Sequence, residues 1–210
     1  MLEMGVYTLP ITSLILFLTG MVIAFQTGTE LSKYHIQYLI GSIVSASMCR
    51  EMGPVLTGLI VAGRVGASIT AELGTMQVSE EIDALKTLAI NPIRYLVMPR
   101  FLACIIMLPI LVIYSDCVGM AGGFIVSKFR IGVDTSTYLD SIKNYLTIKD
   151  IYSGLVKAFV FGIIISIVSC HQGFRTRGGA EGVGKSTTAS VVVSFLLIAI
   201  FDYFLTSMFF

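Results

Sequence analysis

The sequence of 210 residues is 55% hydrophobic and 13% charged, and its mean hydropathy is +0.88. A soluble domain carries about 25% charged residues, and a water-soluble core in so short a chain cannot bury this much apolar side chain. The 14 basic and 13 acidic residues leave a net charge of +1, so no basic surface is available for nucleic acid. The sequence therefore predicts an integral membrane protein, with length for about five spans of ~20 residues.

Five apolar stretches are long enough to cross a membrane as helices, and no stretch shows the alternation of a strand. We predict an all-α, polytopic fold with spans at about 9–27, 53–76, 101–126, 151–170 and 188–208. The apolar segment 36–48 is short for a crossing, and we interpret it as an elbow or half-helix that leads into the second span.

Two polar connections separate these spans, at 77–100 and 127–150. In the second connection, Tyr138, Ile142 and Tyr145 fall at helical spacing, which predicts an amphipathic helix at the membrane interface. Basic residues are shared almost equally between the two sides of a five-span topology, so charge does not orient the chain. The first 25 residues lack a basic region and a small-residue cleavage site, so no removable signal peptide is expected.

The second span combines small residues with two charges. Gly58, Ala62 and Gly66 form one row at four-residue spacing, which lets another helix approach closely in lipid. Arg64 and Glu72 lie about 12 Å apart along the helix axis and about 80° around it, so they do not pair directly. A charge at membrane depth must be shielded. Two interpretations stay open: both residues belong to a functional pathway, or they pair or snorkel merely to hold the bundle together.

Three further charges fall inside the predicted spans, at Asp116, Lys157 and Asp202. For these we favour a structural role. Asp116 is expected to face protein or water, and Lys157 lies close enough to the end of its span to extend its ammonium group to the membrane surface.

A nucleotide-binding pattern, G-x-x-x-x-G-K-[ST], is present at 179–186. A P-loop needs a strand before its glycines, and here a membrane span precedes them. We therefore predict a glycine-rich turn in which Ser186 or Thr187 caps the last helix, and no bound nucleotide.

Residues 77–91 have the signals of a short membrane-parallel helix. Ser79 is a candidate N-cap, three acidic residues follow in the first turn, and Asn91-Pro92 ends the helix. A solvated interfacial helix and a docking element for a soluble partner are both compatible with this pattern.

No catalytic set emerges from the sequence. Neither histidine is paired with a Ser or Cys nucleophile, and metal-ligand spacing is absent. The four cysteines stand apart and predict apolar packing, with neither disulfides nor a zinc site. We expect no enzyme activity, no metal and no cofactor within this chain.

Several long motifs follow one another along the chain. These are Arg50-Glu51-Met52-Gly53-Pro54-Val55-Leu56, Ala62-Gly63-Arg64-Val65-Gly66-Ala67, Thr70-Ala71-Glu72-Leu73-Gly74-Thr75-Met76, Glu81-Ile82-Asp83-Ala84-Leu85, Asn91-Pro92-Ile93-Arg94-Tyr95-Leu96-Val97, Pro99-Arg100, and Gly179-Ala180-Glu181-Gly182-Val183-Gly184 before Thr187-Thr188. With these motifs the sequence resembles the MlaE-type permeases, and the resemblance covers the chain from about residue 5.

The resemblance implies the membrane subunit of an ABC transporter that moves phospholipid or a related lipid between membranes. It implies a homodimer, two copies of a separate cytoplasmic ATPase that uses ATP and Mg²⁺, and MCE-domain proteins on the far side. The expected location is a bacterial inner membrane or a plastid inner envelope. Members commonly begin with an extra amphipathic helix, whereas this chain starts almost at its first span.

The same resemblance implies site residues. It places 77–100 in the cytoplasm as a coupling loop and 127–150 on the periplasmic or intermembrane side. The candidates for contact with the ATPase are Glu80, Glu81, Asp83 and Leu85, and those for the lipid cavity and dimer interface are Gly58, Arg64, Gly66 and Glu72.

Two other functions remain as alternatives. An ion-coupled secondary transporter would use Glu72, Asp116 or Asp202 as a relay, although no inverted repeat is visible. A scaffold that only anchors a complex is the third interpretation.

Overall fold

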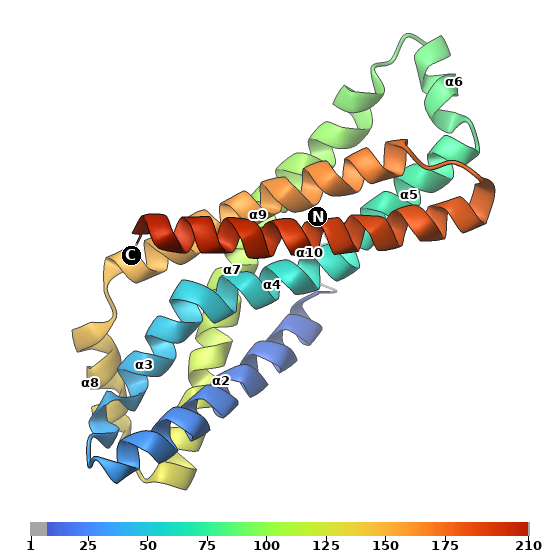
Figure 1. Ribbon diagram of the computed structural model, residues 1–210. Helices are drawn as coiled ribbons and strands as arrows, with labels where there is room; N and C mark the ends of the chain where they lie inside the picture. The colour runs from blue at the N-terminus through green and yellow to red at the C-terminus, as the bar shows by residue number, and fades with distance from the viewer. Residues whose placement is uncertain (1–7, 210) are drawn as a thin grey trace. The chain divides into compact units, whose positions relative to one another are not determined.

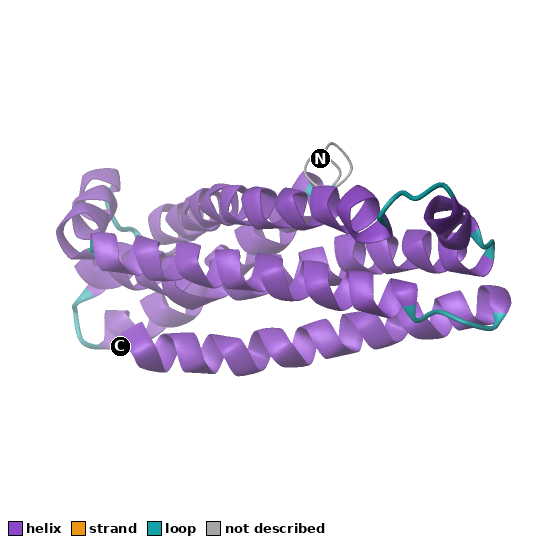
Figure 2. Cartoon of the chain, turned by 90° about the horizontal axis from the view of Figure 1, so that it is seen from above, coloured by secondary structure: helices purple, strands orange, loops and turns teal. Residues whose placement is uncertain are grey.

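The computed structural model describes residues 8–209, and in this range the chain forms helices and no strand (Figures 1 and 2). Five helices are long and apolar enough to cross a membrane, which confirms the predicted all-α, polytopic fold. They are Leu9–Lys33, Gln37–Val78, Ile93–Ile131, Ile148–Phe174 and Gly179–Phe209. The prediction about a signal peptide rests in part on residues 1–7, which lie outside the described residues.

Several long helices contain short 3₁₀ or π-helical turns, so they are divided into shorter elements. In chain order the elements are α2 (Leu9–Lys33), η1 (Gln37–Leu39), α3 (Ile40–Ser47), η2 (Met48–Met52), α4 (Gly53–Val61), η3 (Ala62–Gly66), α5 (Ala67–Val78), α6 (Glu81–Thr87), η4 (Ile93–Val97), α7 (Met98–Val126), η5 (Ser127–Ile131), α8 (Thr135–Tyr145), α9 (Ile148–Phe174) and α10 (Gly179–Phe209).

The chain divides into two compact units. Unit 1 contains Gly58–Leu108 and Ala158–Phe210, and unit 2 contains Leu9–Thr57 and Pro109–Lys157. Each unit therefore combines an early and a late part of the sequence. Its core depends on contacts between residues that are far apart in the chain.

In unit 2, α2 crosses α7 at a point where glycines allow the two backbones to touch. A Cβ on Gly20 would collide with the backbone of Gly119, and a Cβ on Gly122 would collide with the backbone of Phe17. In a membrane such close approach provides the van der Waals contact that holds helices together. Sequence analysis found rows of small residues in the second span and missed this crossing.

Helix α8 packs on α3 within unit 2, and this confirms the helix predicted from the spacing of Tyr138, Ile142 and Tyr145. The Ser141 hydroxyl accepts a hydrogen bond of 3.0 Å from the backbone N–H of Ser42. The Tyr138 side chain is buried and its hydroxyl donates to Met120 O at 3.1 Å. Burial raises the pKa of Tyr138, so the phenol stays protonated and remains a donor.

In unit 1, α10 packs along α5, and buried hydroxyl groups connect these helices to α9. The Thr70 Oγ1 atom lies 3.1 Å from Ser169 O, 2.9 Å from Ser190 Oγ and 3.0 Å from Gly66 O. Ser190 Oγ in turn lies 3.3 Å from Ser169 Oγ. This cluster joins three helices inside an otherwise apolar core.

The structure corrects three predicted helix boundaries. The segment 36–48 is part of one continuous helix with the second span, which begins at Gln37 instead of residue 53. The third long helix begins at Ile93, inside the segment predicted as a loop. The turn predicted at 179–186 is wrong, because α10 begins at Gly179 and Thr187 Oγ1 bonds to Val183 O within the helix. These helices therefore extend beyond the apolar stretches that defined the predicted spans.

Candidate functional site

The exposed face of the second span carries polar side chains at four-residue spacing. Arg64, Ser68 and Glu72 are all exposed, and the small residues Gly63, Ala67 and Ala71 lie beside them on the next row. We call these six residues, which lie on η3 and α5, the η3–α5 face. Arg64 belongs to the π-helical turn η3, and such turns are frequent at functional sites. A polar face on a membrane-spanning helix is unfavourable against lipid tails, so it requires a polar or protein cover.

Glu72 has a partner that sequence analysis did not identify. Arg100, from the start of α7, places Nη2 3.0 Å from Glu72 Oε2, and Ser68 Oγ lies 3.4 Å from Glu72 Oε1. The side chain of Arg100 is 19% exposed and that of Glu72 is 49% exposed. Arg64 makes no ion pair with any residue in 8–209. The Glu72 carboxylate is therefore neutralised within unit 1, whereas the Arg64 guanidinium is not.

Gly58 and Gly66 point at helices of the same chain. A Cβ on Gly58 would lie 3.2 Å from the Phe161 ring, and a Cβ on Gly66 would lie 2.9 Å from Ser169 Oγ. Both neighbours belong to α9. This packing explains the small residues at these two positions by contacts inside unit 1.

The short helix α6 follows α5 after a tight turn. Glu80 occupies the N-cap position with a left-handed backbone (φ 61°), so the predicted N-cap at Ser79 is wrong. The Ser79 hydroxyl instead donates back to Thr75 O at 3.0 Å and lies 3.0 Å from Glu81 Oε1. The helix ends at Thr87, before the predicted stop at Asn91-Pro92.

Helix α6 exposes its charged side chains and buries one apolar side chain. Ile82 is 1% exposed, whereas Glu80, Glu81 and Asp83 are exposed and Leu85 is half-buried. Asp83 forms an exposed ion pair with Lys86 at 2.7 Å. The loop after α6 exposes Leu88 and Ile90 as well, at 70% and 39%. Of the side chains of α6, only Ile82 is buried in the chain itself.

Unit 2 contains two ion pairs between η2 and α9. Arg50 Nε lies 2.7 Å from Asp150 Oδ1, and Lys157 Nζ lies 2.7 Å from Glu51 Oε2. The Lys157 side chain is fully buried, so the prediction that it extends to the membrane surface is wrong. The burial of Lys157 comes from its partner on a helix about a hundred residues away, which the local sequence does not reveal.

Asp116 and Asp202 are both half-buried. Asp116 faces α4, because a Cβ on Gly53 would collide with its Oδ1 atom. This oxygen is buried and has no hydrogen-bond partner among the described residues. Asp116 therefore faces protein, as predicted.

The structure contains no scaffold for nucleotide or metal within residues 8–209. The segment 179–186 is helical, so its backbone N–H groups are mostly engaged in the helix and do not form a phosphate loop. No group of three His, Cys, Asp or Glu side chains in the described range could hold a metal ion. All four cysteines are free, and Cys49, Cys104 and Cys170 are buried.

These features define a polytopic α-helical membrane protein with a polar face on one span and a charged helix at the end of that span. The sequence matches the MlaE permease family over residues 1–208, and the chain belongs to this family of ABC transporter permeases. Its location is accordingly a membrane of the inner-membrane or envelope type.

Relatives in bacteria and plants are similar over most of the chain. A probable ABC transporter permease protein of Rickettsia bellii is 48% identical over 210 residues, which is 100% of this chain and 81% of the relative. A probable permease of Synechocystis is 46% identical over 89% of this chain and 71% of the relative. The chloroplastic protein TRIGALACTOSYLDIACYLGLYCEROL 1 of Arabidopsis thaliana is 42% identical over 91% of this chain and 55% of the relative.

Proposed function

We propose that this chain is the membrane subunit of an ABC transporter that moves phospholipid or a related lipid between two membranes. A separate ATPase would bind and hydrolyse ATP with Mg²⁺, and this chain would bind no cofactor of its own. Family membership supports the permease role, and the Arabidopsis relative carries the name of a glycolipid, which supports a lipid cargo.

The observation that carries the proposal is the η3–α5 face. An unshielded charge inside a membrane costs about 2.5–3.5 kcal/mol on insertion scales, and the face exposes Arg64, Ser68 and Glu72. Small residues beside them allow a second helix to approach closely. We infer that a second copy of the chain covers part of this face, and that the remainder lines a cavity in which Arg64 meets a lipid headgroup.

Helix α6 would transmit force from the ATPase. Its acidic residues Glu80, Glu81 and Asp83 are exposed, and so is Leu88 in the loop that follows. Exposed charge around an apolar contact is typical of a docking surface for a soluble partner. Because α6 follows α5 directly, a push on α6 would reach the polar face. An MCE-domain protein would receive or deliver lipid on the opposite side of the membrane.

Charge reversal on α6 tests this assignment. Asp83→Lys, alone and with Glu81→Lys, should reduce the ATPase that co-purifies with the tagged chain about tenfold, because opposite charges steer and hold such contacts. The matched control is Glu30→Lys, because Glu30 and Lys33 also form an exposed pair at three-residue spacing. One membrane crossing separates that pair from α6. The control should leave the complex and its ATP turnover intact.

Two outcomes would count against the proposal. If the double variant keeps ATPase and turnover at the level of Glu30→Lys, α6 is not the docking element. If transfer of a fluorescent phospholipid between vesicles depends on an ion gradient and not on ATP, the chain is better explained as an ion-coupled transporter. The unpartnered Asp116 carboxylate oxygen would then be the first candidate for the relay.

A further inference from the structure

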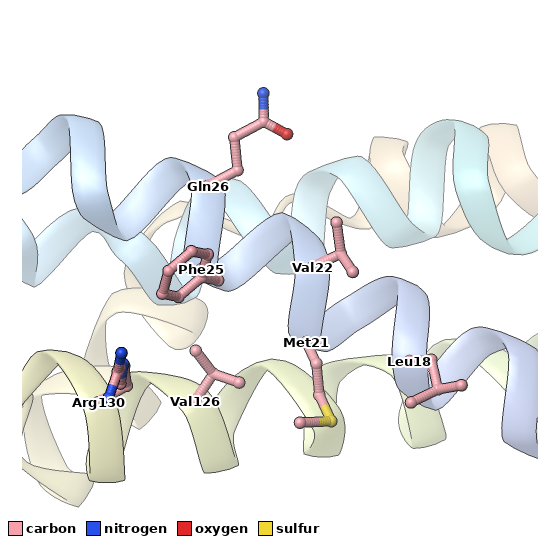
Figure 3. Close-up of a pocket in the computed structure, with 7 residues that line it drawn as sticks. All are labelled: Leu18, Met21, Val22, Phe25, Gln26, Val126 and Arg130. Atoms are coloured by element: carbon pink, nitrogen blue, oxygen red, sulfur yellow. The ribbon is translucent and has the colours of Figure 1, made fainter.

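A largely apolar groove opens on unit 2, between α2 and the end of the third long helix. Its volume is about 730 Å³. Leu18, Met21, Val22 and Phe25 line it from α2, and Val126 of α7 and Arg130 of η5 line it from the other helix. Figure 3 shows Leu18 and Met21 extending from α2 toward α7, with Val126 and Arg130 side by side beneath Phe25, while Gln26 points away.

The groove is short enough to lie within one leaflet of a bilayer. The seven steps from Leu18 to Phe25 advance about 10 Å along the axis of α2. The hydrocarbon core of a bilayer is ~30 Å thick, so one leaflet contributes about 15 Å. This groove therefore suits acyl chains that enter from one side.

A cation lies at one end of the groove. Arg130 is the penultimate residue of the helix Ile93–Ile131, where a span reaches the headgroup region. Its side chain is exposed and forms no ion pair with any residue in 8–209. The neighbouring Lys128 differs, because its Nζ lies 5.8 Å from the Phe124 ring centre and 5.9 Å from that of Phe129.

We propose that this groove binds a resident glycerophospholipid, with its acyl chains along Leu18–Phe25 and its phosphate on the Arg130 guanidinium. Arginine pairs with phosphate through short, charge-assisted hydrogen bonds, and the apolar side chains of α2 provide a surface for the chains. The lipid fills a gap between two helices of one protomer. It is separate from the cargo proposed for the η3–α5 face and does not depend on that proposal.

The absence of tryptophan from the sequence permits a direct test. Val22→Trp introduces a single fluorophore into the groove, at a side chain that is 62% exposed and tolerates a larger group. A phosphatidylglycerol with brominated chains, titrated into the detergent-solubilised protein, should quench this fluorophore with saturation. Adding Arg130→Glu should raise the half-saturating concentration about tenfold or more, whereas Arg130→Lys should have a smaller effect.

Three controls make the result decisive. Lys128→Glu makes the same charge change two residues away and should leave half-saturation unchanged. Leu196→Trp places the fluorophore on an exposed face of α10 and should show quenching without saturation. Brominated diacylglycerol, which lacks phosphate, should not saturate the Val22→Trp signal. The proposal is wrong if Lys128→Glu acts as strongly as Arg130→Glu, if the Val22→Trp signal does not saturate, or if diacylglycerol binds equally well.

Discussion

The two units differ in the burial of the charged residues on their long helices. In unit 2, Lys157 is fully buried against Glu51, and Asp150 is 1% exposed beside Arg50. In unit 1, Arg64 and Glu72 remain exposed on the η3–α5 face, and the acidic residues of α6 are exposed as well. Lys157, Arg64 and Glu72 all come from apolar stretches, whereas Asp150 and the acidic residues of α6 come from the polar connections.

This difference separates charges that hold the fold from charges that are available for contacts. A buried pair is sensitive to the loss of either partner, because the remaining charge stays buried without compensation. An exposed pair contributes little to stability, so its presence in a membrane span requires another explanation. The comparison therefore predicts large effects on stability in unit 2 and small ones in unit 1.

The largest effect is expected for Lys157→Met. The substitution removes the Lys157 ammonium group from the partly buried Glu51 carboxylate and should lower the free energy of unfolding by about 3 kcal/mol. Thermal unfolding of the purified protein in detergent would measure the loss. The double variant with Glu51→Gln should recover part of it, because the two losses are not additive. Full additivity would show that the pair does not stabilise unit 2.

A smaller loss of stability is expected where glycine allows two helix backbones to touch. Gly20→Ala places a methyl group against the backbone of Gly119 and should cost about 1–3 kcal/mol through overpacking. Gly184→Ala, within α10, is the matched control in unit 1, because a Cβ on Gly184 would meet no atom within 4 Å. Alanine there should be neutral or stabilising. Equal unfolding temperatures for the two variants would contradict the crossing described for α2 and α7.

The smallest effect on stability is expected for Glu72→Gln. The Arg100–Glu72 pair is partly exposed, and its loss should change the free energy of unfolding by less than about 1 kcal/mol. Under the proposed function, ATP-dependent transfer of phospholipid should nevertheless fall several-fold. Unfolding and transfer are measured on the same preparation. A large loss of stability would show that Glu72 holds the fold as the charges of unit 2 do, and the difference between the two units would disappear.

Much of the fold was predictable because hydrophobic length and helical spacing are local properties. The five spans and helix α8 follow from patterns within about 20 residues. Helix ends were less predictable. Gly179 begins α10 despite a glycine-rich sequence, and Glu80 takes the position expected for Ser79. In both places contacts and backbone geometry outweigh local preference.

The candidate site, too, was predictable from the sequence only in part. The charges of the second span and of α6 were visible in the sequence as polar residues in or beside an apolar stretch. Their surroundings were not. Arg100 as the partner of Glu72, and α9 as the neighbour of Gly58 and Gly66, come from segments far away in the chain.

The sequence alone determined that this protein crosses a membrane about five times and that it resembles one family of permeases, since composition, periodicity and motif depend only on the order of residues. Tertiary structure decided which charges are buried and which stay exposed. Lys157 and Arg64 both lie in apolar helices, yet only Lys157 finds a carboxylate within 2.7 Å. The reason is physical: the burial of a charge depends on a partner brought near by packing, and local sequence does not encode that proximity.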